Sequence, residues 1–71
     1  MTLAQCEDAV AVARKARLDA QRSLRRAERL ALRAKPRDAA LAVGTVRAAR
    51  RRLAHAWIDE RAWARIVRRM Q

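Results

Sequence analysis

Residues 3–34 read LAQCEDAVAVARKARLDAQRSLRRAERLALRA, without a glycine or a proline. Counted in heptads from Leu3, the first, fourth and seventh positions carry a single charge, Arg17. These positions are Leu3, Cys6, Ala9, Val10, Ala13, Ala16, Arg17, Ala20, Ser23, Leu24, Ala27, Leu30, Ala31 and Ala34. The opposite positions, such as Glu7, Asp8, Arg14 and Lys15, hold no apolar residue. This spacing predicts a long amphipathic helix with a narrow, alanine-rich seam.

The flanking residues mark where this helix starts and stops. Thr2 and Gln5 have the spacing of a capping box, in which each side chain bonds the other residue's backbone N–H. Pro36 disfavours helix at the residue before it and suits the first turn of a new helix. We therefore expect helix over 3–34, a turn over 35–38 and helix over about 38–70. So short a connection predicts antiparallel helices, and one continuous helix kinked at Pro36 is the alternative.

The second helix repeats the pattern. Its predicted seam is Ala39, Ala42, Val43, Val46, Ala49, Leu53, Ala56, Trp57, Trp63, Ala64, Val67 and Met70. Gly44, the only glycine, lies on the far face, where it marks either a close approach by another backbone or nothing. In an antiparallel hairpin Arg17 comes within reach of Asp59 and Glu60. We expect an ion pair between the helices that fixes their register, or side chains that extend separately to water.

The composition indicates an all-α hairpin whose core is incomplete. Of the 71 residues 52% are hydrophobic, but many are alanine and only two are aromatic. Two helices meeting along small side chains bury little apolar surface. We therefore expect either a helical partner protein or a second copy, as a homodimer, to complete a four-helix bundle.

The residue types and their spacing do not support several functional classes. There is one histidine, no Ser/His/Asp set and no glycine-rich phosphate loop, so we expect no enzyme activity, no cofactor and no small-molecule substrate. The single Cys6 rules out an internal disulfide and is expected to be a packed thiol. The sequence also lacks the apolar run of a signal peptide or a membrane span. We therefore expect a cytoplasmic protein.

Positive charge is concentrated around the predicted turn. Eleven of the eighteen Lys and Arg residues lie between 22 and 52, with only two acidic residues among them. The candidate anion-binding residues are Arg22, Arg25, Arg26, Arg29, Arg33, Arg47, Arg50, Arg51 and Arg52. They favour contact with nucleic acid phosphates or with an acidic protein surface, and a solvated face is the third interpretation. No aromatic residue interrupts them, so stacking on bases is not supported.

Large apolar residues outside the seams are candidates for partner binding. They are Val12, Leu18, Leu32, Leu41, Ile58 and Ile66, with Trp57 and Trp63 near the open end of the hairpin. Together they predict a second, weaker apolar strip that docks on other helices. The two tryptophans either fill the core beside the first turns or anchor the partner.

The first helix resembles a known family. Leu3, Glu7, Asp8, Arg14, Leu24, Arg25 and Ala27 follow a pattern similar to the E-component co-chaperones of type III secretion needles. The resemblance implies a cytoplasmic antiparallel hairpin. It would pair with a helical-repeat chaperone to keep the needle subunit from polymerising. The alternatives are a nucleic-acid-binding hairpin of phage or plasmid origin and an adaptor or inhibitor that docks on an acidic protein.

Overall fold

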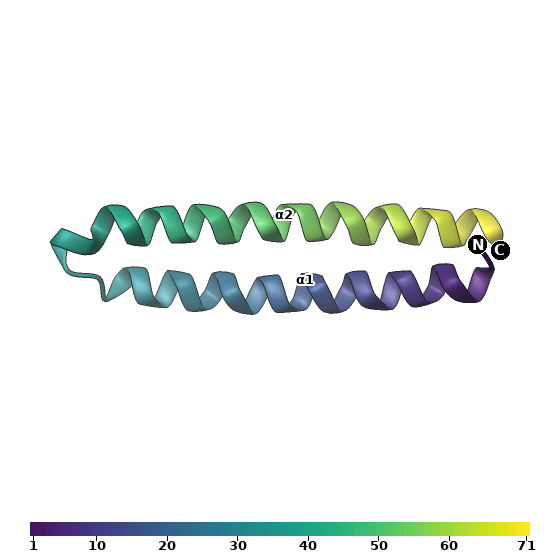
Figure 1. The fold of residues 1–71 in the computed structure, drawn as a ribbon, viewed down its shortest axis with the longest axis horizontal. Helices are drawn as coiled ribbons and strands as arrows, with labels where there is room; N and C mark the ends of the chain where they lie inside the picture. The colour runs from purple at the N-terminus through teal and green to yellow at the C-terminus, as the bar shows by residue number, and fades with distance from the viewer.

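The chain folds into two long antiparallel helices (Figure 1). The structure is a computed structural model that describes all of residues 1–71. Helix α1 spans Leu3–Leu32, the short 3₁₀ helix η1 spans Pro36–Asp38, and helix α2 spans Ala39–Met70. Both termini lie at the same end of the rod (Figure 1). The predicted all-α antiparallel hairpin is confirmed, and the single kinked helix is excluded.

The helix ends follow from local chemistry. The Gln5 backbone N–H donates to Thr2 Oγ1 at 3.1 Å, and the Thr2 N–H donates to Gln5 Oε1 at 2.8 Å, which confirms the capping box. Helix α1 ends at Leu32, two residues before the expected Ala34. Lys35 is extended, with φ −72° and ψ 155°, because the proline that follows disfavours a helical conformation there.

Helix α1 packs against α2 through two columns of its heptads. Cys6, Ala13 and Ala27 are buried, and the remaining first and fourth positions are half-buried. The seventh positions behave differently: Ala9 is half-buried, whereas Ala16, Ser23 and Leu30 are exposed. The assignment of the three exposed residues to the seam was therefore wrong. A hairpin gives each helix one neighbour, and one neighbour covers only the first and fourth columns.

Helix α2 presents the matching columns. Two columns of α2 are buried or half-buried throughout: Ala42, Val46, Ala49, Leu53, Ala56, Glu60, Trp63 and Val67. Ala48, Ala62 and Ala64 beside them are half-buried as well. Four residues predicted in this seam, Ala39, Val43, Trp57 and Met70, are exposed instead. Ala39 and Met70 lie at the ends of α2, and Val43 and Trp57 lie beside the contact line, where α1 covers them only in part. Glu60 therefore occupies a position that the apolar pattern would give to an aliphatic side chain.

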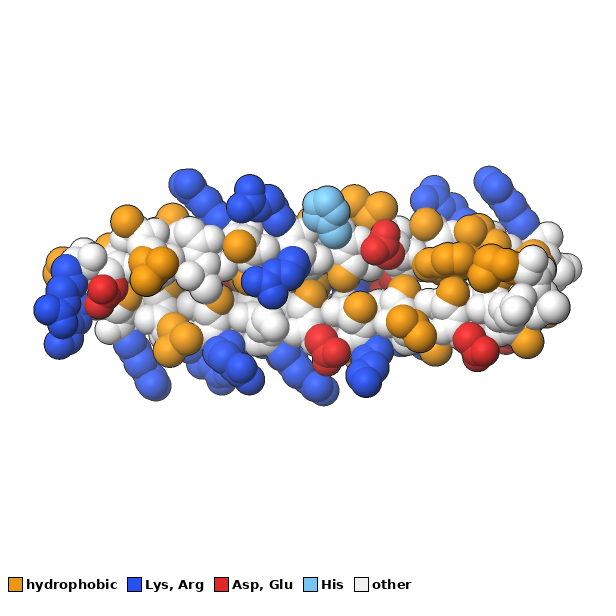
Figure 2. All heavy atoms as spheres, in the orientation of Figure 1, with side chains coloured by type: hydrophobic (Ala, Val, Ile, Leu, Met, Phe, Trp, Pro, Cys, Tyr) orange, Lys and Arg blue, Asp and Glu red, His pale blue; other side chains and the backbone are white.

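The resulting rod is thin. Its Cα atoms extend over 53 × 13 × 13 Å, with a radius of gyration of 16.1 Å, against about 11 Å for a compact domain of this length. Only five of 71 residues are buried. The accessible surface is 5838 Å², whereas a compact monomer of this mass exposes about 4,500 Å². The hairpin therefore exposes apolar surface that a compact domain would cover, as the space-filling view shows (Figure 2).

Candidate functional site

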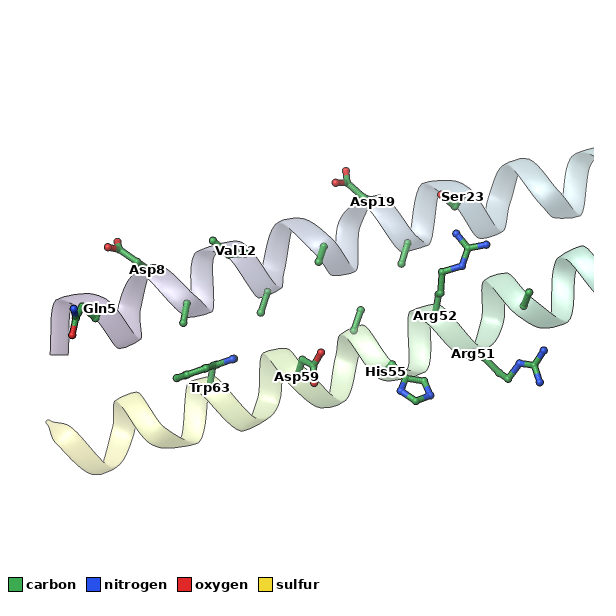
Figure 3. A pocket seen from close by; sticks show the side chains of 16 residues that line it. Gln5, Asp8, Val12, Asp19, Ser23, Arg51, Arg52, His55, Asp59 and Trp63 are labelled. Atoms are coloured by element: carbon green, nitrogen blue, oxygen red, sulfur yellow. The ribbon is translucent and has the colours of Figure 1, made fainter. Parts of the chain in front are cut away.

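A long groove runs along one side of the hairpin, between α1 and α2 (Figure 3). Its volume is about 1180 Å³. Helix α1 lines it with Gln5, Asp8, Ala9, Val12, Ala13, Ala16, Asp19, Ala20 and Ser23. Helix α2 lines it with Ala48, Arg51, Arg52, His55, Ala56, Asp59 and Trp63. The lining residues of α1 recur every three or four positions, so they form one stripe along the helix.

The groove is hollow because its floor is alanine. An alanine side chain ends at Cβ. Alanines on successive turns of both helices therefore leave a channel between the two antiparallel helices. Larger apolar side chains stand only near the open end of the hairpin, where Val12 is 70% exposed and Trp63 is half-buried. Both line the groove, and Figure 3 shows Trp63 extending from α2 toward α1. The groove can therefore bind a ligand that is long, narrow and largely apolar.

Charges of both signs lie along the groove. Asp59 and Arg52 are both exposed and lie seven residues apart on α2, and neither makes an ion pair within the hairpin. Figure 3 shows Arg52 extending from α2 toward Ser23 of α1. Asp19 is held at 3.8 Å by Arg22, one helical turn along the same helix. Arg51 on α2 and Asp8 on α1 also line the groove without an ion-pair partner. The groove therefore offers unpaired charges of both signs.

A separate polar cluster joins the two helices outside the groove. Glu60 accepts hydrogen bonds from the Nε atoms of Arg17 and Arg14, the latter at 3.2 Å. The Arg17 guanidinium also donates to Gln21 Oε1 at 3.3 Å and stacks over the Trp57 ring, 4.2 Å from its centroid. The predicted ion pair between the helices is confirmed. Glu60 is its acid, whereas Asp59, the other candidate, lies in the groove.

The pKa of Glu60 reflects this cluster. The hydrogen bond from Arg17 lowers the pKa of the Glu60 carboxyl below its ordinary value, and the Arg14 hydrogen bond and both positive charges act in the same direction. Burial opposes them, because the charged form loses solvation. Glu60 is therefore ionised at neutral pH, and it is satisfied by two arginines at a position where an unpaired charge would be costly.

The predicted apolar strip does not form one surface. Of its eight members, Val12 and Trp63 line the groove. Leu32 lines a second hollow of about 460 Å³ beside the turn. The rest line neither hollow, and all of them are exposed: Leu18, Leu41, Trp57, Ile58 and Ile66. These residues occupy different heptad positions, and a straight helix keeps different positions on different sides.

The nine candidate anion-binding arginines are all exposed. Arg22 alone among them has a carboxylate partner, and that contact is loose. Arg51 and Arg52 line the groove, and Arg47 and Arg50 line the hollow beside the turn. Blue side chains therefore occur on both edges of the rod and around the turn (Figure 2). The structure distributes these arginines around the rod instead of gathering them on one face.

Sequence reasoning missed the groove itself. Ala9, Ala16 and Ser23 were assigned to the contact with α2, whereas they line the open channel. The available signal was the width of the uncharged stripe, because three columns are more than one neighbouring helix can cover.

Other kinds of site are not found. No group of three or more His, Cys, Asp or Glu side chains converges on a point where a metal could bind. Neither α1 nor α2 contains an apolar stretch suited to crossing a lipid bilayer. No family model matches the sequence, and no curated protein or solved structure is significantly similar to it.

Proposed function

We propose that this hairpin is a non-enzymatic protein-binding module that docks α-helices into the groove between α1 and α2. The observation that carries the proposal is the open, alanine-floored groove on a chain with only five buried residues. Association that covers this groove stabilises both the complex and the hairpin, because burial of apolar surface is the main favourable term in each.

The dimensions favour a helix as the occupant. The stretch of α1 that lines the groove, residues 5–23, is about 27 Å long at the helical rise of 1.5 Å per residue. Small side chains let helix axes approach closely, and ridges on one helix fit the spaces between small residues on another. An amphipathic helix laid in an apolar groove is a common mode of recognition.

The resemblance of the first helix to type III secretion co-chaperones suggests a partner class. In that form of the proposal, the groove docks on a helical-repeat chaperone and the complex shields a needle subunit. The exposed Val12 and the half-buried Trp63 supply anchors for either kind of helical partner.

A photo-crosslinking amino acid at Ser23 tests the groove directly. Ser23 is exposed and lines the groove, whereas Arg25, two residues along, is exposed and does not. The probe at Ser23, introduced in the native cells, should give discrete protein adducts that mass spectrometry identifies, and the probe at Arg25 should give far fewer. Equal adducts from both positions, or none from either, would refute helix docking in the groove.

A second candidate function rests on the arginines near the turn. Residues 22–52 contain eleven basic and two acidic side chains, and most of these arginines have no carboxylate partner. Arginine guanidinium groups without a carboxylate partner are suited to binding phosphates. If the hairpin binds a labelled RNA or DNA duplex, fluorescence anisotropy should show affinity falling steeply with salt. The variant Arg25→Gln/Arg29→Gln should reduce that slope by about two.

The same assay separates nucleic acid from an acidic protein. A salt-independent signal, or a slope unchanged in the double variant, would remove the nucleic acid interpretation. The unpaired arginines would then either contact an acidic protein surface or only be solvated.

A further inference from the structure

We infer that the occupant of the groove is a second copy of this chain, docked antiparallel across a two-fold axis that crosses the middle of the rod. The inference rests on the proposed function, that the groove binds helices, and it names the partner and the orientation. Four residues surround the proposed axis, Asp19 and Ala20 on α1 and His55 and Ala56 on α2, and all four line the groove.

The first argument is the uncovered column of α1. Its seventh heptad positions carry no charge, yet α2 leaves three of the four exposed, including Leu30 at 62%. An antiparallel copy placed on the proposed axis sets each member of this column against another member. The resulting contacts are Ala9 with the second copy's Leu30, and Ala16 with its Ser23. Each pairs a small side chain with a larger one, as interdigitated packing requires.

The second argument is charge complementarity on α2. On α2, the seventh heptad positions are Thr45, Arg52, Asp59 and Ile66, when Val46, Leu53, Glu60 and Val67 are counted as first positions. The same axis brings these positions of the two α2 helices together. It sets Arg52 against the second copy's Asp59 and, by symmetry, Asp59 against its Arg52. Both residues line the groove, and neither has an ion-pair partner within the hairpin. One further contact of this column, Thr45 with the second copy's Ile66, covers a side chain that is 38% exposed.

The register of the hairpin makes the two sets of contacts compatible. Arg14 and Arg17 both reach Glu60, so the midpoint of the α1 column stands level with the midpoint of the α2 column. A single axis therefore serves both helices. A different register between α1 and α2 would require two axes, and the two copies could not satisfy both columns at once.

The charge of the whole chain selects the antiparallel orientation. The turn half, residues 22–52, contains eleven basic and two acidic residues, and the remainder is nearly balanced. Parallel copies would place two strongly positive halves side by side, whereas antiparallel copies hold them at opposite ends. That separation matters because the rod is 53 Å long and the Debye length at physiological salt is about 8 Å.

The surface area fits a dimer. The chain exposes 5838 Å², about 1,300 Å² more than a compact monomer of its mass. A standard interface covers about 800 Å² on each partner. One such interface would therefore remove most of the excess and would form a four-helix bundle.

Charge exchange across the proposed contact provides the test. Asp59→Lys makes both symmetric contacts Lys–Arg, and Arg52→Glu makes both Asp–Glu. Each variant turns two attractions into two repulsions, so its self-association, measured by sedimentation equilibrium, should weaken about fivefold or more. An equimolar mixture of the two variants should associate again, because both contacts of the mixed dimer pair opposite charges.

Matched controls exclude an effect of net charge. Glu7→Lys changes the charge as Asp59→Lys does, and Arg65→Glu changes it as Arg52→Glu does, and neither position lines the groove. Both controls should associate like the unaltered chain. All four positions are exposed and make no ion pair or hydrogen bond through their side chains, so the hairpin fold does not depend on them. Circular dichroism of each variant checks this.

The outcomes separate this inference from the proposed function. If the unaltered chain is monomeric up to near-millimolar concentration, or if the mixture of variants fails to associate, the antiparallel dimer is wrong. Adducts from Ser23 to another protein would then leave helix docking intact. If the dimer is correct, the Ser23 probe crosslinks the second copy near Ala16. A monomer without any adduct from Ser23 would remove both proposals.

Discussion

Replacement of Gly44 by alanine should stabilise the protein. Gly44 lies inside α2, is exposed and has no positive φ, so alanine fits its backbone conformation. A Cβ added there would meet no heavy atom within 4 Å. Glycine in a helix interior is less favourable than alanine by about 0.8–1.0 kcal/mol, because its unfolded backbone has more freedom to lose.

The expected size of the effect follows from the length of the chain. For 71 residues, the entropy of unfolding near the midpoint is about 150 cal/mol/K, at about 2.1 cal/mol/K per residue. A gain of about 0.9 kcal/mol therefore raises the melting temperature by about 6 °C. Thermal unfolding followed by circular dichroism measures it, with all variants at one chain concentration because association shifts the midpoint.

A reverse substitution on the same helix is the control. Ala54 is exposed in the interior of α2, so Ala54→Gly should lower the melting temperature by a similar amount. If Ala54→Gly behaves as expected and Gly44→Ala fails to stabilise, the reasoning is refuted. Another backbone must then approach Gly44 from outside the hairpin.

Two further predictions concern the Glu60 cluster and the buried thiol. The pKa of Glu60 is lowered in the fold, so the unfolded chain binds the proton more readily and stability falls as pH drops below about 4.3 toward the folded pKa. Urea unfolding at a series of pH values should show this decline, and Glu60→Gln should flatten it; an equal decline in the variant would contradict the assignment. Cys6 is 1% exposed, so a thiol reagent should react with it more slowly than with an Ala4→Cys thiol in a Cys6→Ala chain. Urea should abolish the difference, and equal rates without urea would show that the first turns of α1 do not stay packed.

Local signals predicted most of the fold. The capping box, the reversal at Pro36 and the first and fourth heptad columns each depend on residues close in sequence, and each was correct. The contact between Arg17 and Glu60 was predictable for a different reason. The seams are composed mostly of small apolar residues, so an unpaired charge in one seam is costly. The favourable arrangement is an ion pair with the opposite charge in the seam of the other helix.

The groove was harder to predict because a heptad pattern does not state how many neighbours a helix has. Ala16 and Leu30 suit a seam whether α2 covers them or another chain does. The exposed apolar residues failed as a group for a related reason. Val12 and Ile58 are both large and exposed, but they belong to different sides of the rod, and composition alone does not order residues around an axis.

The polar cluster and the groove are connected through register. Alanine seams fit together at many offsets, since successive alanines present nearly identical surfaces. Arg17, Glu60 and Trp57 remove that freedom, because their contacts form at a single offset. All three belong to one chain, so they fix the register before any partner arrives. The seventh positions of α1 and α2 are thereby placed level with each other, and a partner meets a groove that is already formed. Docking then orders few additional side chains, which lowers its entropic cost.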